Sequence, residues 1–171
     1  MDTTVTLQDI LVSREERARE QKRIIRKTGC PLICFTVVMP GPEKLNREAR
    51  IIFEAGSRAL SKSLGRFATP VWYELVKKTG HEGYYAVSAD EKELKELTVS
   101  IEENHPLGRL FDMDVIGLSG EPVSRKEIGR PERKCLVCGG PAAVCVKGRA
   151  HAVEEIGKKI SAMVAGYERT F

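Results

Sequence analysis

The sequence predicts an α/β fold, of the α+β kind, in which a mixed β-sheet is flanked by helices. Two observations support this prediction. Apolar runs rich in strand-forming residues alternate along the chain with segments whose apolar residues recur at helical spacing. The 171 residues, 42% of them apolar, are enough for one buried core, and no internal repeat or low-complexity linker divides them. We therefore expect a single domain over residues 1–171.

The first half of the chain predicts two helices around one buried strand. Residues 7–27 have apolar positions on one side of a helix and a heavily charged outer side. Residues 32–39 are almost continuously apolar, the pattern of a strand buried on both faces. After the turn at Pro40-Gly41-Pro42, residues 44–64 place apolar side chains at helical spacing again.

The second half of the chain predicts further alternation of strands and helices. The expected elements are short strands at 71–73 and 84–87, a helix over 90–104, a strand over 110–118, a short strand after the turn at 119–122, and a last helix over 150–165. Residues 71–73 could instead begin a helix. Between the last two elements lies a small cysteine-containing segment, residues 125–151, which glycine and proline interrupt and which we expect to be a basic loop.

Several classes of protein are excluded by composition. No apolar run approaches the 18 residues that a membrane-spanning helix needs. The N-terminus has no basic start followed by an apolar stretch, so we expect no secretory signal. Five cysteines, an odd number, in a chain without an export signal indicate reduced thiols and a cytoplasmic location. Cys30 and Cys34 lie beside and within the buried strand and are predicted core residues.

The net charge of +4 is unevenly distributed along the chain. Residues 13–27 carry seven basic and three acidic side chains, and residues 125–151 carry seven basic and two acidic side chains. These two basic zones on a weakly acidic body indicate anionic partners: phosphates, nucleic acid or an acidic protein. A solvated helix face explains the first zone equally well.

Two carboxylates interrupt the apolar strand at 110–118. Side chains alternate along a strand, so Asp112 and Asp114 share one face, with their Cβ atoms roughly 6.6 Å apart. This span suits one divalent cation, or two, held over a phosphoryl group. Without a cation the two like charges would repel one another beside apolar surface. The alternative is a half-exposed strand with one solvated face.

A second group of residues has metal-ligand spacing. Cys135, Cys138, Cys145 and His151 form a C-x2-C-x6-C-x5-H pattern, with Gly139-Gly140-Pro141 providing a tight turn. Cysteine and histidine at such spacing can satisfy tetrahedral zinc. Reduced thiols that pack a small satellite core are the alternative, with His151 in some other role.

Four arginines, Arg125, Arg130, Arg133 and Arg149, share this segment, close in sequence to the carboxylate strand. Guanidinium groups bind phosphate oxygens through two hydrogen bonds at once. A carboxylate pair that can hold a metal, together with an arginine cluster, is typical of enzymes that catalyse phosphoryl or nucleotidyl transfer.

Motifs spread in order over nearly the whole chain resemble one known family, the apo-citrate lyase phosphoribosyl-dephospho-CoA transferases, also called citrate lyase holo-acyl-carrier-protein synthases. The matching motifs are Ser13-Arg14-Glu15-Glu16-Arg17, Pro31-Leu32, Pro40-Gly41-Pro42-Glu43-Lys44, residues 105–115 (HPLGRLFDMDV), Ser124-Arg125, Gly129-Arg130-Pro131, Arg133, Cys135-Leu136, Cys138, Ala143, Cys145 and His151. The central motif and the basic cysteine segment are specific in combination.

The resemblance implies a nucleotidyltransferase-like domain and a particular reaction. The 2′-(5″-phosphoribosyl)-3′-dephospho-CoA group passes from its triphosphoribosyl precursor to a serine of the apo acyl carrier (γ) subunit of citrate lyase, and diphosphate leaves. By analogy, Asp112 and Asp114 hold Mg²⁺, with Arg109 and His105 beside them as further catalytic residues. The expected substrate-binding residues are Arg125, Arg130, Arg133, Arg149 and His151.

The sequence allows more than one assignment for the third carboxylate and for the carrier. Many nucleotidyltransferases use a third carboxylate, and Asp90, Glu121 and Glu127 are all candidates. The basic side of the first helix could dock the acidic carrier. The alternatives to the main hypothesis are the same chemistry on another carrier, such as that of malonate decarboxylase, or a non-catalytic zinc-clipped module that binds nucleic acid. The scarcity of aromatic residues beside the basic segment makes nucleic acid an unlikely partner.

Overall fold

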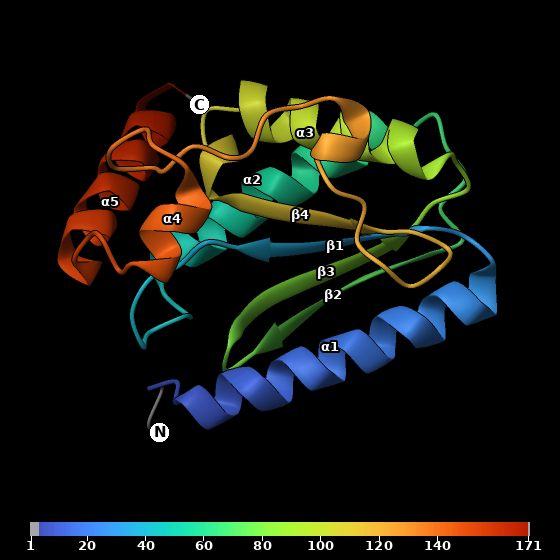
Figure 1. Cartoon of the computed structure of the whole chain (residues 1–171), viewed down its shortest axis with the longest axis horizontal. Coiled ribbons are helices and arrows are strands. Elements are labelled where there is room, and N and C mark those ends of the chain that lie inside the picture. The colour runs from blue at the N-terminus through green and yellow to red at the C-terminus, as the bar shows by residue number, and fades with distance from the viewer. Residues whose placement is uncertain (1–3, 171) are drawn as a thin grey trace.

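The computed structural model describes residues 4–170, which form a four-stranded antiparallel sheet with helices on both faces (Figure 1). The strand order is β2-β3-β1-β4. The strands are β1 (Leu32–Val37), β2 (Val71–Lys77), β3 (Gly80–Ala86) and β4 (Phe111–Ile116). The α-helices are α1 (Leu7–Thr28), α2 (Arg47–Leu64), α3 (Glu91–Asn104), α4 (Ala142–Lys147) and α5 (Val153–Thr170), and two 3₁₀ turns are η1 (Gly108–Leu110) and η2 (Lys126–Ile128).

The order β1-α2-β2-β3-α3-β4 is the split βαβ connectivity of ferredoxin-like sheets. Each crossover helix joins two strands that run in the same direction, but another strand lies between them in the sheet. The predicted helix-flanked α/β class is confirmed. The pairing differs from the mixed pairing that we expected, because all three neighbouring pairs are antiparallel.

Helix α1 covers one face of the sheet by itself. It begins with a capping box between Thr6 and Asp9 and ends at Gly29, which adopts a left-handed conformation with φ of 65°. Near the C-terminal end of α1, Ile24 and Ile25 pack against the strand side chains that point to this face, among them Leu32, Cys34 and Tyr84. The prediction that Cys34 is a core residue is confirmed, and Cys30 is partly buried against the same cluster.

Helices α2, α3 and α5 cover the opposite face, where the larger core lies. Phe35 of β1 stacks on Phe53 of α2, with ring centroids 4.9 Å apart. A Cβ added at Gly56 would lie 2.2 Å from the Phe35 ring, so glycine is required there for close approach of α2 to the sheet.

Several element boundaries differ from the sequence prediction. The α2 helix begins at Arg47 and not near residue 44, because Asn46 caps it by accepting a hydrogen bond from the Ala49 amide at 2.8 Å. The last helix begins at Val153 and not at residue 150. Just before it, Arg149 has a positive φ of 46°, which is not a right-handed helical conformation.

The segment after β4 also differs from the prediction. The short strand expected after residue 122 is reduced to a single bridge between Pro122 and Ile116, and the basic loop contains the short helix α4. Within residues 4–170, no helix is both long and apolar enough to cross a membrane.

Candidate active site

Asp112 and Asp114 lie on the face of the sheet that α1 covers, at its edge strand β4. Their cross-strand neighbours on β1 are Thr36 and Cys34, which point to the same face. The Thr36 hydroxyl donates to Asp112 Oδ2 at 3.3 Å. Because α1 packs over β1 and β3, the end of this face at β4 stays open and Asp114 is exposed to solvent. The structure therefore brings the two predicted carboxylates together on an accessible surface.

The electrostatics of this pair favour a cation. Reduced solvation within the surrounding protein, followed by repulsion from Asp112, raises the pKa of Asp114 to about 6. Lys95 and Arg133 counter this rise only in part. A divalent cation between the carboxylates would remove the repulsion, and carboxylate oxygens are the ligands that Mg²⁺ prefers. The donor set therefore fits the expected metal.

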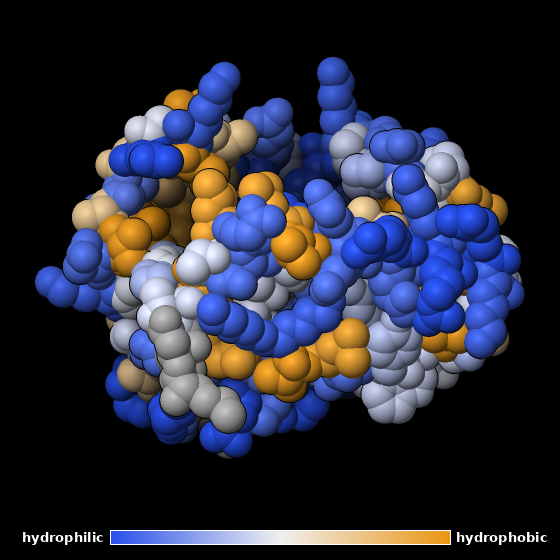
Figure 2. Space-filling view, turned by 90° about the horizontal axis from the view of Figure 1, so that it is seen from below, coloured by the Kyte–Doolittle hydropathy of each residue, from blue (hydrophilic) through white to orange (hydrophobic). Residues whose placement is uncertain are grey.

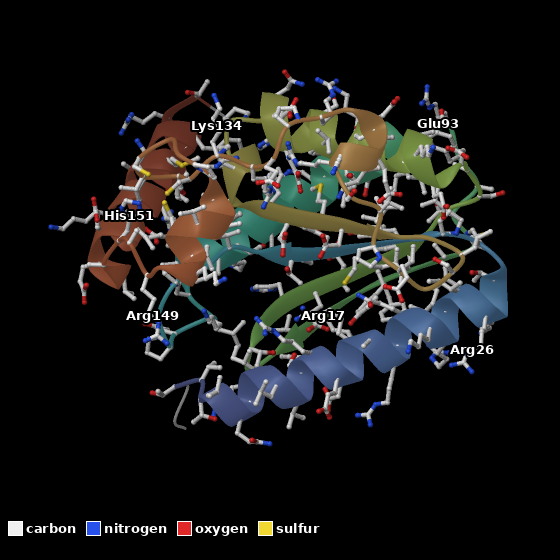
Figure 3. The ribbon with its side chains drawn as sticks, viewed as in Figure 1. Arg17, Arg26, Glu93, Lys134, Arg149 and His151 are labelled. Atoms are coloured by element: carbon white, nitrogen blue, oxygen red, sulfur yellow. The ribbon has the colours of Figure 1, made fainter. Side chains whose placement is uncertain are left out.

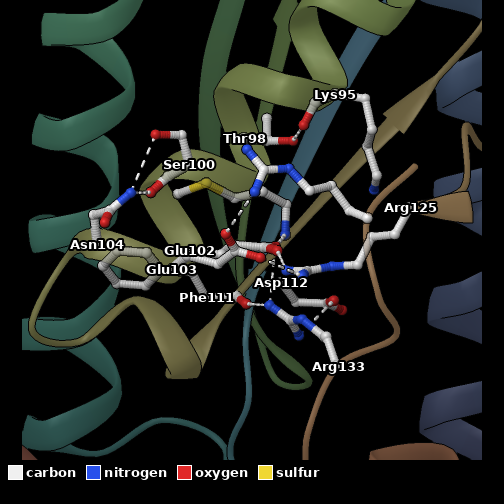
Figure 4. A network of polar contacts seen from close by, with 12 residues as sticks. Lys95, Thr98, Ser100, Glu102, Glu103, Asn104, Phe111, Asp112, Arg125 and Arg133 are labelled. Carbon is white, nitrogen blue, oxygen red and sulfur yellow. Dashed lines mark hydrogen bonds and ion pairs between the residues drawn. The ribbon is translucent and has the colours of Figure 1, made fainter. Parts of the chain in front are cut away.

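Two of the predicted arginines are held by a buried glutamate of α3 (Figure 4). Glu102 is 5% exposed; its Oε2 accepts from Arg125 Nη2 at 2.6 Å, and its Oε1 pairs with Arg133 Nη2 at 2.9 Å. The same carboxylate accepts a hydrogen bond from the Met113 amide at 3.0 Å, and Arg133 donates to the Phe111 carbonyl. These contacts pair the Met113 amide and the Phe111 carbonyl on the outer edge of β4 and fix the strand that carries the aspartates.

Arg133 also reaches the aspartates directly, since its Nη1 lies 3.6 Å from Asp112 Oδ1. Arg130 is more exposed and lies 3.7 Å from Glu103. Arg109 lies near this group: burial and then the charges of Arg133 and Arg125 lower its pKa. Among residues 4–170, no carboxylate forms an ion pair with Arg109, so its guanidinium is available to an anionic ligand.

Two predicted site residues lie elsewhere. His105 ends α3 and accepts a hydrogen bond from the Leu107 amide at Nδ1, 3.0 Å away. Its ring packs against Phe111 and Tyr167, on the face of the sheet opposite to the aspartates. Arg149 is exposed at the end of α4 and makes no ion pair with any described residue. Among the described residues, neither His105 nor Arg149 forms a hydrogen bond or an ion pair with the carboxylate pair.

The candidate third carboxylates lie outside the strands of the sheet, at a helix cap, in the 3₁₀ turn η2 and in the turn after β4. Asp90 caps α3 through the amides of Lys92 and Glu93, Glu127 accepts from the Ser124 amide, and Glu121 is exposed in the turn after β4. The carboxylate that does share the face is Glu82 on β3, which lies opposite Thr36. It is 1% exposed and already bound by Arg17 at 2.8 Å and Lys77 at 3.2 Å.

Sequence reasoning missed Glu102 and Glu82, because a charged residue in a helix or strand is normally solvated. For Glu102 the spacing held a signal. It follows Leu94 and Thr98 on the buried side of α3, at successive four-residue steps.

The predicted cysteine and histidine ligands form a compact group at the C-terminal end of the molecule, here called the thiol cluster (Cys135, Cys138, Cys145 and His151). Their ligand atoms all lie within 4.8 Å of one another, so the cluster can bind a metal such as zinc. The turn at Gly139, with φ of 73°, brings the first two cysteines together, and α4 carries the third.

The protonation behaviour of the thiol cluster fits a cation. Amide hydrogen bonds from Cys138 and Val137 lower the pKa of Cys135 to about 6, whereas contact with Cys138 raises the pKa of Cys145 to about 12. His151 Nε2 is buried without a hydrogen-bond partner among the described residues, while Nδ1 lies 3.5 Å from Glu155. At zinc sites, a histidine commonly binds the metal through one ring nitrogen while its other ring nitrogen contacts a carboxylate.

Together, the fold and the site define an α/β protein with a carboxylate pair and neighbouring arginines at the edge of its sheet, an arrangement compatible with metal-dependent nucleotidyl transfer. Comparison with known proteins makes the assignment specific. The family model for apo-citrate lyase phosphoribosyl-dephospho-CoA transferase matches residues 5–167, and the chain belongs to this family of transferases.

Curated relatives match over almost the full chain. A probable apo-citrate lyase phosphoribosyl-dephospho-CoA transferase of Vibrio cholerae serotype O1 (strain M66-2) is 37% identical over 97% of this chain and 95% of its own length. The apo-citrate lyase phosphoribosyl-dephospho-CoA transferases of Escherichia coli O7:K1 and Shigella boydii serotype 18 are each 36% identical over 94% of this chain and 88% of their own.

Proposed function

We propose that this protein transfers the 2′-(5″-phosphoribosyl)-3′-dephospho-CoA group from its triphosphoribosyl precursor to a serine of the apo acyl carrier subunit of citrate lyase. The serine oxygen forms a bond to the first phosphorus of the triphosphate, the bond to the remaining two phosphates breaks, and diphosphate leaves. The hydroxyl proton is lost to a base or to water. The observation that carries the proposal is the pair Asp112 and Asp114 on an accessible sheet face, in a chain of this family.

We further propose that Asp112 and Asp114 are the ligands of Mg²⁺. A metal held there would supply charge neutralisation on the reacting phosphates and on the leaving diphosphate. Thr36 and Arg133 orient Asp112 through the contacts already described.

The arginines divide into two roles in this proposal. Arg109 has no carboxylate partner among the described residues, and half-exposed Arg130 makes only a 3.7 Å contact with Glu103, so we assign both to binding of the donor phosphates. Arg125 and Arg133 hold Glu102 and the outer edge of β4, which makes them positioning residues for the aspartates. His105 supports the core beneath β4 through its contact with Phe111.

For the thiol cluster we propose a structural zinc ion. Tetrahedral zinc with bonds of about 2.3 Å to sulfur places two thiolates about 3.8 Å apart, and Cys138 Sγ lies 3.5 Å from Cys145 Sγ. Such an ion would tie α4 and the start of α5 to the turn at Cys135. We also place the protein in the cytoplasm, a proposal that its five free cysteines support.

The zinc proposal predicts about one zinc per chain by inductively coupled plasma mass spectrometry. Cys138→Ser is expected to lower both zinc content and melting temperature, whereas Cys30→Ser, outside the cluster, leaves the zinc content unchanged. Protein that contains no zinc, and that added zinc does not stabilise, would contradict this assignment.

The transfer itself is tested by mass spectrometry of the apo acyl carrier subunit of citrate lyase after incubation with this protein, Mg²⁺ and the triphosphoribosyl donor. The expected result is a mass increase equal to the donor minus diphosphate. A parallel reaction with the carrier of malonate decarboxylase tests carrier choice. Modification of neither carrier, with both shown to be competent, would reject the proposed activity.

A further inference from the structure

A small cavity lies beside the carboxylate pair, between α1, the end of β1 and the turn that joins β2 to β3. Its volume is about 150 Å³, and its wall includes three basic side chains, Arg14, Arg17 and Lys44, with the hydroxyls of Ser13 and Thr36. No carboxylate lines it among the described residues. We call it the α1 pocket. It is smaller than the roughly 300–1,000 Å³ of a typical ligand site, so it suits one group of a larger ligand.

Thr36 connects the α1 pocket to the candidate metal site. Its side chain contributes to the pocket wall, and its hydroxyl donates to Asp112 Oδ2 at 3.3 Å. The two residues are also cross-strand partners in the register of β1 and β4. A ligand in the pocket would therefore be a neighbour of a metal bound at Asp112.

Two of the three basic side chains around the α1 pocket have no carboxylate partner among the described residues. Arg17 is held by buried Glu82, which fixes its guanidinium in the wall. Arg14 forms no ion pair or hydrogen bond with any described residue. Lys44 donates only to the Met39 carbonyl, and burial lowers its pKa. Two basic side chains without a carboxylate partner thus face the same cavity.

This arrangement differs from the arginines near Glu102. There, Arg125 and Arg133 are each satisfied by carboxylates, and an incoming phosphate would have to compete with Glu102 and Glu103. In the α1 pocket, Arg14 and Lys44 have no such competitor among the described residues, whereas Arg17 is paired with Glu82. Guanidinium and ammonium groups that lack an anionic partner favour binding of phosphate oxygens.

We propose that the α1 pocket binds a phosphate or diphosphate group of the donor, with Arg14 and Lys44 as its contacts and Arg17 as a fixed cation behind them. The inference rests on the proposed function for the identity of the donor. Two parts of that donor carry the required chemistry: its triphosphate end and the diphosphate bridge of its dephospho-CoA part.

The test is isothermal titration of the full-length protein with two separate probes, inorganic triphosphate with Mg²⁺ and dephospho-CoA. Loss of a charge-assisted hydrogen bond weakens binding by about 10–100-fold, so Arg14→Ala and Lys44→Met are each expected to raise the Kd for one probe by about tenfold or more. Arg19→Ala on the exposed side of α1 and Lys62→Met on α2 are the matched controls and should bind as the wild type does. Circular dichroism verifies that each variant folds.

Each outcome decides the inference. Weaker triphosphate binding by the two pocket variants assigns the pocket to the reacting end of the donor, and weaker dephospho-CoA binding assigns it to the bridge. The inference is overturned if the wild type binds neither probe, if the pocket variants bind both within twofold of wild type, or if only Arg130→Ala loses binding. Transfer to the carrier by the wild type is measured separately, so failure of the pocket is distinguishable from failure of the proposed activity.

Discussion

At the scale of a single residue, Asp114 combines a proposed functional role with a destabilising one. Its carboxyl lies on the same face as Asp112, where reduced solvation and repulsion from Asp112 raise its pKa to about 6 and disfavour the second negative charge. Replacement by asparagine removes this charge but keeps the size of the side chain. We therefore expect activity and stability to respond in opposite directions.

Asp114→Asn is expected to lower the rate of transfer by at least about 10²–10³-fold, the loss typical of one preorganised electrostatic contact. In the metal-free protein, relief of up to about 1 kcal/mol of repulsion raises the melting temperature by up to about 4 °C. Differential scanning calorimetry and the carrier assay measure the two effects. Near-normal turnover by this variant would show that Asp114 is not a residue of the active site.

Glu82 is the most buried carboxylate of the described residues, at 1% exposed. Burial opposes its ionisation, but hydrogen bonds from Tyr84 and Arg17 outweigh this effect and lower its pKa below the ordinary 4.5. A group whose pKa is lowered by folding stabilises the protein above its unfolded pKa, and this contribution is lost as the pH falls through the folded pKa.

Glu82→Gln is therefore expected to cost about 3–5 kcal/mol of unfolding free energy at pH 7, because Arg17 and Lys77 lose their buried partner. The difference from wild type should shrink progressively below pH 4.5. Urea unfolding at pH 7 and at pH 3.5 measures it, with exposed Glu96→Gln as the control. A difference that is the same at both pH values would contradict the assigned pKa shift.

At the scale of elements, the close contact of α2 with the sheet depends on the absence of a Cβ at Gly56. Gly56→Ala would place a Cβ 2.2 Å from the Phe35 ring, and overpacking of this kind costs about 1–3 kcal/mol. Gly157 in α5 has open space around its Cα, so Gly157→Ala should stabilise the helix by up to about 1 kcal/mol. Thermal unfolding of the two variants is expected to shift in opposite directions, and equal shifts would show that α2 can move away from β1.

The elements with a strong periodic pattern were predictable from the sequence. The charged helix at 7–27, the buried strand at Leu32–Phe35 and the placement of Asp112 and Asp114 on one strand face all follow from side-chain periodicity. Periodicity does not indicate which strands become neighbours. The order and antiparallel pairing of the strands are therefore known only from the structure. Short helix α4 lies between Pro141 and Gly148, where the local sequence indicates a loop.

The site was only partly predictable, for a related reason. Arg125 and Arg133 are close to the aspartates, as their sequence proximity suggested, but their binding by Glu102 depends on how α3 packs beside β4. The α1 pocket joins residues of the first helix with Thr36 and Lys44. No local pattern brings these residues together, because the contact arises when α1 folds across the sheet.

At the scale of the whole molecule, α1 separates two surfaces. Its inner side lines the α1 pocket and the sheet, whereas its outer side presents basic residues to solvent, including Arg26 near its C-terminal end (Figure 3). Seen from the α1 side, the surface is mainly hydrophilic, with apolar areas between the charged side chains (Figure 2). An acidic carrier that approached this side would meet this basic surface.

This geometry predicts electrostatic docking of the carrier. The double charge reversal Arg26→Glu with Lys27→Glu is expected to lower kcat/KM for the carrier by about tenfold at low salt while kcat at saturating carrier is unchanged, since rim charges act mainly on encounter. The loss should diminish as salt increases, because exposed charges are screened beyond about 10 Å at 0.1 M. Lys158→Glu with Lys159→Glu on α5 reverses the same charge on another exposed helix and should leave the carrier KM unchanged. If the two double variants have equal kcat/KM for the carrier at every salt concentration, the outer side of α1 is not the docking surface.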